Sequence, residues 1–307
     1  MRTLVVASGK GGTGKTTMTA VLVHVAAPSR PLAVADCDVE GSNLPLALSV
    51  DVVSRTAFAG RPRAVVDEEV CAGCGVCLDR CRFGALSLSD DGLAVIDPWL
   101  CESCGACTWG CPLDAISFEP QQAGEVLVGE GPAGPMVFGL LRPGEDLSGK
   151  LVTSVRERVA ALADERGVGL VIVDGPPGVG CPTIASITGA DGVLAVSEPT
   201  LSGEHDLRRL VSLAHQLGVP VKVVLNKADL SETGAQRIRS ACSSLGVELV
   251  GELDFDTDLP RALGAVARGT RPPSSLDSSS FVHSVRAIWP RVDPERADWA
   301  LPDDGSG

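Results

Sequence analysis

The stretch SGKGGTGKTT, residues 8–17, fits the pattern G-x-x-x-x-G-K-[ST] at Gly9, Gly14, Lys15 and Thr16. Glycines allow backbone N–H groups to turn toward phosphate oxygens without a Cβ clash. The helical pattern that follows presents the positive end of a helix dipole to the same phosphates. In this pattern Lys15 neutralises the β- and γ-phosphates and Thr16 ligates Mg²⁺. The stretch therefore predicts a loop that binds a nucleoside triphosphate.

Short apolar runs alternate with helical patterns on both sides of this loop. The predicted strands are residues 3–8, 31–36, 124–128, 135–141, 169–174, 192–197, 221–226 and 247–253. The predicted helices run from the loop to about Ala27, and over 151–165, 202–217, 232–245 and 257–268. This alternation predicts an α/β fold of the P-loop NTPase class, with a doubly wound, mainly parallel sheet. Aromatic residues are only 3% of the chain, so the core is aliphatic and suits a sheet buried on both faces.

Charge and hydropathy argue against nucleic acid and membrane as partners. The chain has 26 Lys and Arg against 39 Asp and Glu, a formal net charge of −13, which argues against a protein that grips nucleic acid. No apolar stretch of about 18 residues predicts a membrane span, and the N-terminus does not resemble a signal peptide. We expect a cytoplasmic protein with no nucleic-acid or membrane partner, whose clustered cysteines are metal ligands and not disulfides.

A second lysine, Lys10, stands early in the loop. With it, KGGTGKT (10–16) resembles the deviant Walker A motif of the MinD/ParA/Mrp ATPases, which include the nitrogenase iron protein. The resemblance implies that Lys10 reaches across a dimer interface to the partner's nucleotide, in an ATP-sandwich homodimer. There it would stabilise charge on the transferring phosphoryl group, as an arginine finger does. The implied nucleotide-binding residues are Gly9, Lys10, Gly11, Gly12, Thr13, Gly14, Lys15, Thr16, Thr17 and Asn226.

Two further segments resemble the family's switch regions. DCDVEGSNL (36–44) is similar to switch I, which implies that Asp38 positions the attacking water. Asp36 and Asn43 would support it. LVIVDGPPGVG (170–180) is similar to Walker B and switch II, which implies that Asp174 belongs to the Mg²⁺ shell beside Thr16. The implied catalytic residues are therefore Lys10, Lys15 and Asp38.

VLNKAD (224–229) is similar to the base-recognition segment, with Asn226 meeting adenine. N-K-x-D also occurs in GTP-binding proteins, where the Asp, here Asp229, recognises guanine. Because the other motifs are of the deviant ATPase kind, ATP is the expected nucleotide. The whole resemblance covers about residues 1–270.

Eight of the 11 cysteines lie in two runs, VCAGCGVCLDRC (70–81) and LCESCGACTWGC (100–111). Each run reads Cys-x₂-Cys-x₂-Cys-x₃-Cys, and soft thiolates at this spacing are typical ligands of iron–sulfur clusters. Zinc sites usually show Cys-x₂-Cys pairs set further apart, so zinc fits less well. RFGALSL (82–88) and PLDAISF (112–118) extend the repeat, and each predicts a short strand. The last cysteine of the second run is followed by Pro112, as the pattern requires. The first run departs from the pattern, because Arg82 follows its last cysteine.

The repeat resembles a bacterial 2[4Fe–4S] ferredoxin, in which the fourth cysteine of each run ligates the other cluster. The resemblance implies one cluster on Cys71, Cys74, Cys77 and Cys111, and another on Cys81, Cys101, Cys104 and Cys107. We expect this small α+β domain at 62–118, inserted in an ATPase domain of 1–61 and 119–270. Residues 271–307 would be a linker, a short helix near 281–289 and a flexible tail.

Three cysteines lie outside the runs. Cys37 and Cys242 are expected to be buried and inert. Cys181 follows the switch II segment, near the expected dimer face, and is a candidate for an additional redox or metal role.

The resemblance implies a homodimeric ATPase that couples its nucleotide state to electron transfer through two [4Fe–4S] clusters, toward an unidentified redox protein. A second hypothesis is a carrier or scaffold that delivers clusters or metal to an acceptor protein. Mrp-type relatives use a C-terminal cysteine pair for this, and none follows Cys242. A third is MinD/ParA-like positioning. It fits less well because ADWALPDDGSG (297–307) is acidic, whereas MinD-type proteins use a basic amphipathic helix.

Overall fold

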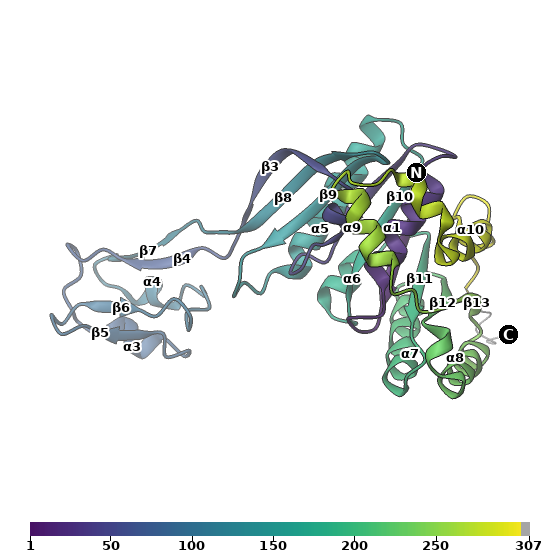
Figure 1. The fold of residues 1–307 in the computed structure, drawn as a ribbon. Coiled ribbons are helices and arrows are strands. Elements are labelled where there is room, and N and C mark those ends of the chain that lie inside the picture. Colours follow the sequence, from purple (N-terminus) through teal and green to yellow (C-terminus); the bar gives the residue numbers. More distant parts are fainter. Residues whose placement is uncertain (302–307) are drawn as a thin grey trace. The chain divides into compact units, whose positions relative to one another are not determined.

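The computed structural model describes residues 1–301, and Figure 1 shows the fold. The chain divides into two compact units. The first comprises Met1–Thr56 and Glu125–Gly307, and the second is Ala57–Gly124. Over the described residues, none of the helices combines the length and apolar character needed to cross a membrane.

The first unit is built on a nine-stranded sheet with the order β13-β12-β11-β1-β10-β2-β9-β8-β3. All pairings from β13 to β9 are parallel, so the predicted mainly parallel α/β fold is confirmed. Residues 132–133 alone connect β8 to β9, as in a β-hairpin. The strands are β1 Arg2–Ser8, β2 Leu32–Asp36, β3 Asp51–Ala59, β8 Gln122–Gly131, β9 Gly134–Leu141, β10 Leu170–Pro177, β11 Gly192–Ser197, β12 Val221–Asn226 and β13 Glu248–Leu253.

Helices bury both faces of this sheet. Leu4 and Val6 of β1 pack in one apolar cluster with α1 and α10. Their neighbours Val5 and Ala7, which point to the opposite face, are equally buried. The helices are α1 Lys15–Ala26, α2 Leu44–Ala47, α5 Ser148–Glu165, α6 Cys181–Ile187, α7 Leu201–Gln216, α8 Glu232–Leu245, α9 Leu259–Ala267 and α10 Ser280–Val292, with 3-10 turns at Ala228–Leu230 and Pro273–Ser278.

Residues 273–292 form more regular structure than their sequence suggests. Residues 273–278, predicted as linker, form a 3-10 turn, and α10 extends three residues beyond the predicted end at 289. Phe281, Val285 and Trp289 are buried in the main apolar cluster because their spacing of four places them on one face of the helix. This segment therefore belongs to the core of the first unit. The predicted flexible tail from residue 302 lies outside the described residues.

The second unit contains two small antiparallel sheets and two short helices. β4 Arg63–Val66 pairs with β7 Ile116–Glu119, and β5 Leu86–Leu88 pairs with β6 Ala94–Ile96. Short strands were predicted in the two repeated segments, and β5 and β7 lie at the ends of these segments. Strands β4 and β6 were not predicted. The helices are α3 Val76–Arg80 and α4 Ala106–Gly110. One buried apolar cluster consists of Ala64, Cys77, Ala94, Cys107 and Ile116, and Ala85, Ala115 and Ala123 are also buried.

Candidate functional site

The phosphate loop lies between the end of β1 at Ser8 and the start of α1 at Lys15. Two of its residues, Gly12 and Gly14, have left-handed backbone angles, with φ of 79° and 90°. A Cβ atom on Gly14 would lie 2.3 Å from Nδ2 of Asn226. The conformation therefore requires glycine at position 14, both for its φ angle and for the space beside it.

Replacing Gly14 with alanine is expected to lower the free energy of unfolding by about 1–3 kcal/mol, because the loop must shift or remain strained. The same change should weaken nucleotide binding. Gly11→Ala is the matched control, since a Cβ there would meet nothing within 4 Å. Its effect on stability should stay within about 0.5 kcal/mol. Chemical denaturation of the two variants checks the prediction, and equal stabilities would contradict it.

The carboxylate of Asp174 contacts three side chains of α1. Lys15 Nζ lies 3.1 Å from Oδ1 of Asp174, and both side chains are buried. The hydroxyl of Thr16 donates to Oδ2 at 2.7 Å, and that of Thr19 donates to Oδ1 at 2.9 Å. The pairing of β1 with β10, which aligns Val6 with Asp174, brings these distant segments together. Thr19 was not predicted, although it follows Lys15 by one helical turn and so lies on the same face.

Asp36, at the end of β2, shapes the segment that resembles switch I. Its carboxylate accepts hydrogen bonds from the N–H of Asp38 at 2.9 Å, the hydroxyl of Ser42 at 2.7 Å and the N–H of Leu44 at 3.1 Å. Burial, and then the charge of Asp174, raise the pKa of Asp36 to about 7. Asp38 is only partly buried. Burial raises the pKa of Asp38 while the nearby charge of Lys15 opposes the rise.

Lys10 is held by residues of its own chain, beyond the end of β11. Its ammonium group pairs with Glu198 and donates to the hydroxyls of Ser202 at 2.8 Å and Thr200 at 3.3 Å. Lys227 also contacts Glu198, at 3.3 Å, and donates to the carbonyl of Gly12 at 2.8 Å.

Glu198 therefore neutralises two lysines beside the loop. Burial alone would raise its pKa, but the hydrogen bonds and charges of Lys10 and Lys227 outweigh burial and lower it. Glu198 was not predicted. Its position just after a parallel strand was the available signal, because ligand sites of α/β sheets lie at the carboxyl ends of strands.

Asn226 and Asp229 both contact backbone groups. The amide of Asn226 donates to the carbonyl of Thr13 at 2.8 Å and so fixes the phosphate loop. Asp229 accepts a hydrogen bond from the N–H of Phe255 at 2.7 Å. The contact of Asn226 with adenine stays a prediction.

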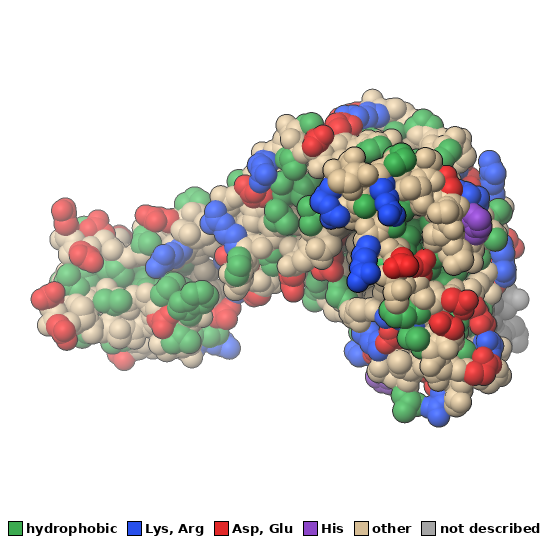
Figure 2. Space-filling model, in the orientation of Figure 1, with side chains coloured by type: hydrophobic (Ala, Val, Ile, Leu, Met, Phe, Trp, Pro, Cys, Tyr) green, Lys and Arg blue, Asp and Glu red, His purple; other side chains and the backbone are tan. Residues whose placement is uncertain are grey.

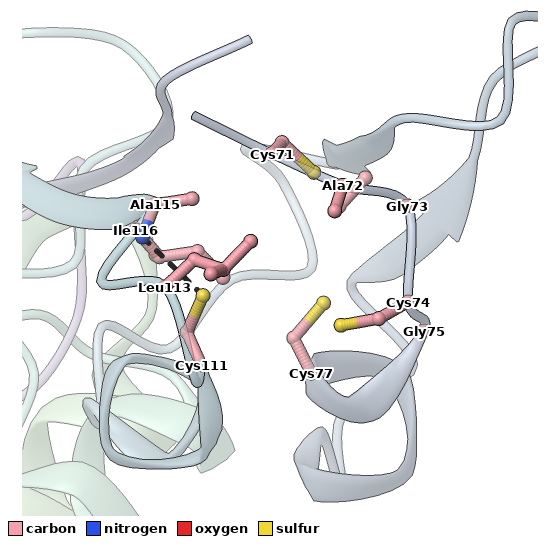
Figure 3. Close-up of a pocket in the computed structure, with 11 residues that line it drawn as sticks. Cys71, Ala72, Gly73, Cys74, Gly75, Cys77, Cys111, Leu113, Ala115 and Ile116 are labelled. Atoms are coloured by element: carbon pink, nitrogen blue, oxygen red, sulfur yellow. Dashed lines mark hydrogen bonds between the residues drawn. The ribbon is translucent and has the colours of Figure 1, made fainter. Parts of the chain in front are cut away.

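The eight cysteines of the second unit fall into two sets, and each set lines one cavity. Figure 3 shows the first cavity, with the sulfurs of its four cysteines turned toward the same space. The fourth cysteine of each set comes from the other run, and the ligation of clusters by these sets stays a prediction. The first set is Cys71, Cys74, Cys77 and Cys111, and the second is Cys81, Cys101, Cys104 and Cys107.

The surroundings of the two sets repeat each other. Gly75 and Gly105 have left-handed φ angles of 73° and 81° and begin α3 and α4. The N–H of Ala85 donates to Sγ of Cys81, and that of Ala115 to Sγ of Cys111, each at 3.3 Å. Across residues 1–301, no group of three or more His, Cys, Asp or Glu is arranged to hold a metal ion. The sulfurs of each set instead surround a cavity.

The other three cysteines differ in burial. Cys37 and Cys242 are buried, as predicted, and burial raises the pKa of both thiols. Cys181 is exposed at the first residue of α6. Its redox or metal role stays a prediction.

A parallel sheet whose first strand runs into a glycine-rich loop and a helix, with a buried Lys–Asp pair behind the loop, defines a P-loop nucleotide-binding protein. The family model of the CobQ/CobB/MinD/ParA nucleotide-binding domain matches residues 4–265. The chain belongs to this family of nucleotide-binding proteins.

Its relatives span nearly the whole chain. The uncharacterized protein MJ0578 of Methanocaldococcus jannaschii is 31% identical over 261 residues, which are 85% of this chain and 87% of the relative. The uncharacterized ATP-binding protein MJ0547 of the same organism is 24% identical, over 87% of this chain and 78% of its own. The structure of the septum site-determining protein MinD with Mg-ADP from Pyrococcus horikoshii matches with a TM-score of 0.56 and 17% identity, over 95% of this chain and 96% of that one. This last likeness shows the fold.

Proposed function

We propose that this protein is a homodimeric ATPase that couples ATP binding and hydrolysis to electron transfer through two [4Fe–4S] clusters in Ala57–Gly124. The observation that carries the proposal is the division of eight cysteines into two sets of four, each around its own cavity. A cubane cluster is ligated through four separate irons, so its cysteines surround a space and do not meet at one atom. Each such cluster, when bound, takes up and releases one electron.

The residues around the cavities fit such a cluster. All four ligands of each set are soft thiols, and the rest of the lining is largely apolar, including Leu113 and Ile116 in the first cavity and Ile96 and Phe118 in the second. The N–H groups of Ala85 and Ala115 already donate to cysteine sulfur. The small apolar core also supports the proposal. The apolar side chains that this unit buries are mostly alanines and cysteines, so a metal centre would add stability that such a core does not supply.

The nucleotide half of the proposal assigns chemistry to the loop and its neighbours. Thr16 and Asp174 would hold Mg²⁺ through oxygen atoms, the ligands that this ion prefers. Lys15 would leave Asp174 for the β- and γ-phosphates, and the positive ion would replace its charge at the carboxylate. Asp38 would position the attacking water. Lys10 would leave Glu198 and reach the nucleotide of the second subunit.

The order of segments along the chain supports coupling. Residues 36–44 lead through α2 and β3 into the second unit, so a nucleotide-dependent change in this loop acts on the strand that enters the cysteine-bearing segment. The electron partner is a further protein.

Anaerobically purified protein is expected to contain about eight irons per chain, and any single cysteine-to-serine change in the runs should remove about four. Double variants test the crossed sets. Cys77→Ser with Cys111→Ser should lose no more iron than either alone, because both belong to the first set. Cys77→Ser with Cys107→Ser should lose nearly all of it. Cys242→Ser is the control and should keep every iron. Colourless, iron-free protein would overturn the proposal.

The likeness to MinD favours a second candidate, an ATPase that positions other components. Spectroscopy with and without Mg-ATP separates the candidates. A nucleotide-dependent shift in cluster potential or reactivity supports electron transfer. ATP-dependent binding to vesicles of anionic lipid, with no such shift, supports positioning. Transfer of iron and sulfide to an apo-ferredoxin supports a carrier, the alternative raised by the cysteines.

A further inference from the structure

Two tryptophans in the second unit are almost completely exposed. The exposed fraction is 82% for Trp99 and 93% for Trp109. Trp99 lies two residues before Cys101, and Trp109 lies two residues after Cys107, and both cysteines line the second cavity. Large aromatic side chains are enriched at protein interfaces, where they supply most of the binding energy. Two free indoles beside one set of thiols therefore require an explanation.

The first repeat provides an internal comparison. The N–H of Glu69 donates to Oδ1 of Asp67 at 3.0 Å, and the N–H of Trp99 donates to Oδ1 of Asp97 at 2.8 Å. Glu69 and Trp99 thus occupy the same turn in the two repeats.

The short helices give a second equivalent pair. Asp79 and Trp109 are the fourth residues of the five-residue helices α3 and α4. Both backbone positions therefore form equally well with a carboxylate as with an indole. The tryptophans are not needed for local folding, so each is an exposed indole that only the second repeat has, two residues from a cysteine of the second set. We call Trp99 and Trp109 the indole surface.

Charge selects what can cover the indole surface. Residues 57–124 contain ten Asp or Glu, four Arg and no Lys or His, a formal charge of −6. Figure 2 shows acidic side chains spread over this unit with few basic ones among them. A second copy of the unit and an anionic membrane would both be negatively charged, so this unit would repel both. A protein with a basic surface would be attracted.

We propose that the indole surface is the docking site for a basic electron-transfer protein, which exchanges electrons at the second set of cysteines. The exchange rests on the proposed function, whereas the docking does not. Electron-transfer complexes are small and short-lived, and a few aromatic anchors can supply most of the energy of such a contact. The net negative charge of the unit attracts the partner, and the tryptophans hold it.

The test transfers the residues of the first repeat to the second, as Trp99→Glu with Trp109→Asp. The probe is cytochrome c, a basic haem protein that accepts one electron. With chemically reduced protein in a stopped-flow experiment, the second-order rate constant should fall about tenfold, as expected from the loss of interface tryptophans. The variant adds two negative charges, so a purely electrostatic contact would react faster. A rate equal to or above that of the wild type overturns the proposal.

Two controls isolate the contact. Glu69→Gln with Asp79→Asn changes the equivalent positions of the first repeat, and the rate constant with cytochrome c should change by less than about threefold, as for rim charges. Reduction of an uncharged small quinone, an acceptor that needs no docking surface and is not steered by charge, should be the same in all variants. An equal loss with the quinone would place the damage in the clusters and also overturn the proposal.

A binding measurement separates this proposal from the function on which the exchange rests. Isothermal titration of cytochrome c into the full-length protein needs no electron transfer. A Kd about tenfold weaker in the tryptophan double variant supports the docking surface. Equal Kd values overturn it. Failure of the proposed function would be seen in the iron analysis, as purified protein that contains no iron.

Discussion

Replacing Lys15 with methionine is expected to destabilise the nucleotide-free protein by about 3–5 kcal/mol, because the change leaves a buried carboxylate without its partner. Lys15 and Asp174 are 3.1 Å apart, and their exposed fractions are 6% and 0%. The hydroxyls of Thr16 and Thr19 would still donate to Asp174, but they carry no compensating charge. Affinity for Mg-ATP should fall about 100-fold or more, since a charge-assisted contact to phosphate is lost.

The double variant Lys15→Met with Asp174→Asn separates the two effects. It removes both charges of the pair, so most of the stability should return, as when a buried ion pair is replaced by neutral groups. Nucleotide affinity should not return, because both the lysine and the magnesium ligand are gone. Urea denaturation and nucleotide titration measure the two quantities. A single variant that is as stable as the wild type would show that the pair contributes nothing to the fold.

The largest effect on turnover is expected from Lys10→Ala. ATP hydrolysis should fall by about 10³-fold, the lower end of the effect of a residue supplied by a second subunit. Binding of Mg-ATP should be nearly unchanged, because Lys10 contacts Glu198, Thr200 and Ser202 of its own chain before the dimer forms. Stability should change little, because these are contacts of a partly exposed side chain.

Mixing two inactive variants shows from which subunit Lys10 acts. Asp38→Asn should also be inactive, because it lacks the residue that positions water. In a mixed dimer, the site on the Lys10→Ala subunit keeps its own Asp38 and receives Lys10 from its partner. An equal mixture should therefore regain about a quarter of the wild-type rate, since half of the dimers are mixed and each has one working site. If Lys10 acts within its own subunit, the mixture stays inactive.

Much of the nucleotide site was predictable because its residues lie in contiguous motifs. The sequence patterns singled out Lys15, Thr16 and Asp174, and the structure places Lys15 and Thr16 against the buried carboxylate of Asp174. Thr19 and Glu198 were missed, because single residues outside a motif become visible only when the strand order brings them next to it. The hydrogen bond from Asn226 to the carbonyl of Thr13 was not expected, because it depends on a loop conformation that the sequence does not specify, and the contact of Asn226 with adenine stays a prediction.

The fold was predictable where apolar runs are buried on both faces, as in β1, β10, β11 and β12. Strand β3 is exposed along almost its whole length, so hydrophobicity gave no signal there. The predicted end of the last helix at residue 289 was wrong for a different reason. Pro290 normally ends a helix, but α10 continues to Val292 because that side chain is completely buried in the core.

The exchange of one cysteine between the two runs has a consequence for biosynthesis. A growing chain has no full quartet of thiols until Cys107 has left the ribosome, and the other quartet is finished only four residues later, at Cys111. A truncated product that ends after the first run would contain four cysteines but would complete neither set of four. If the proposed clusters bind, neither can gain all four of its ligands before the second run has been made, so both would be loaded late in synthesis or after it.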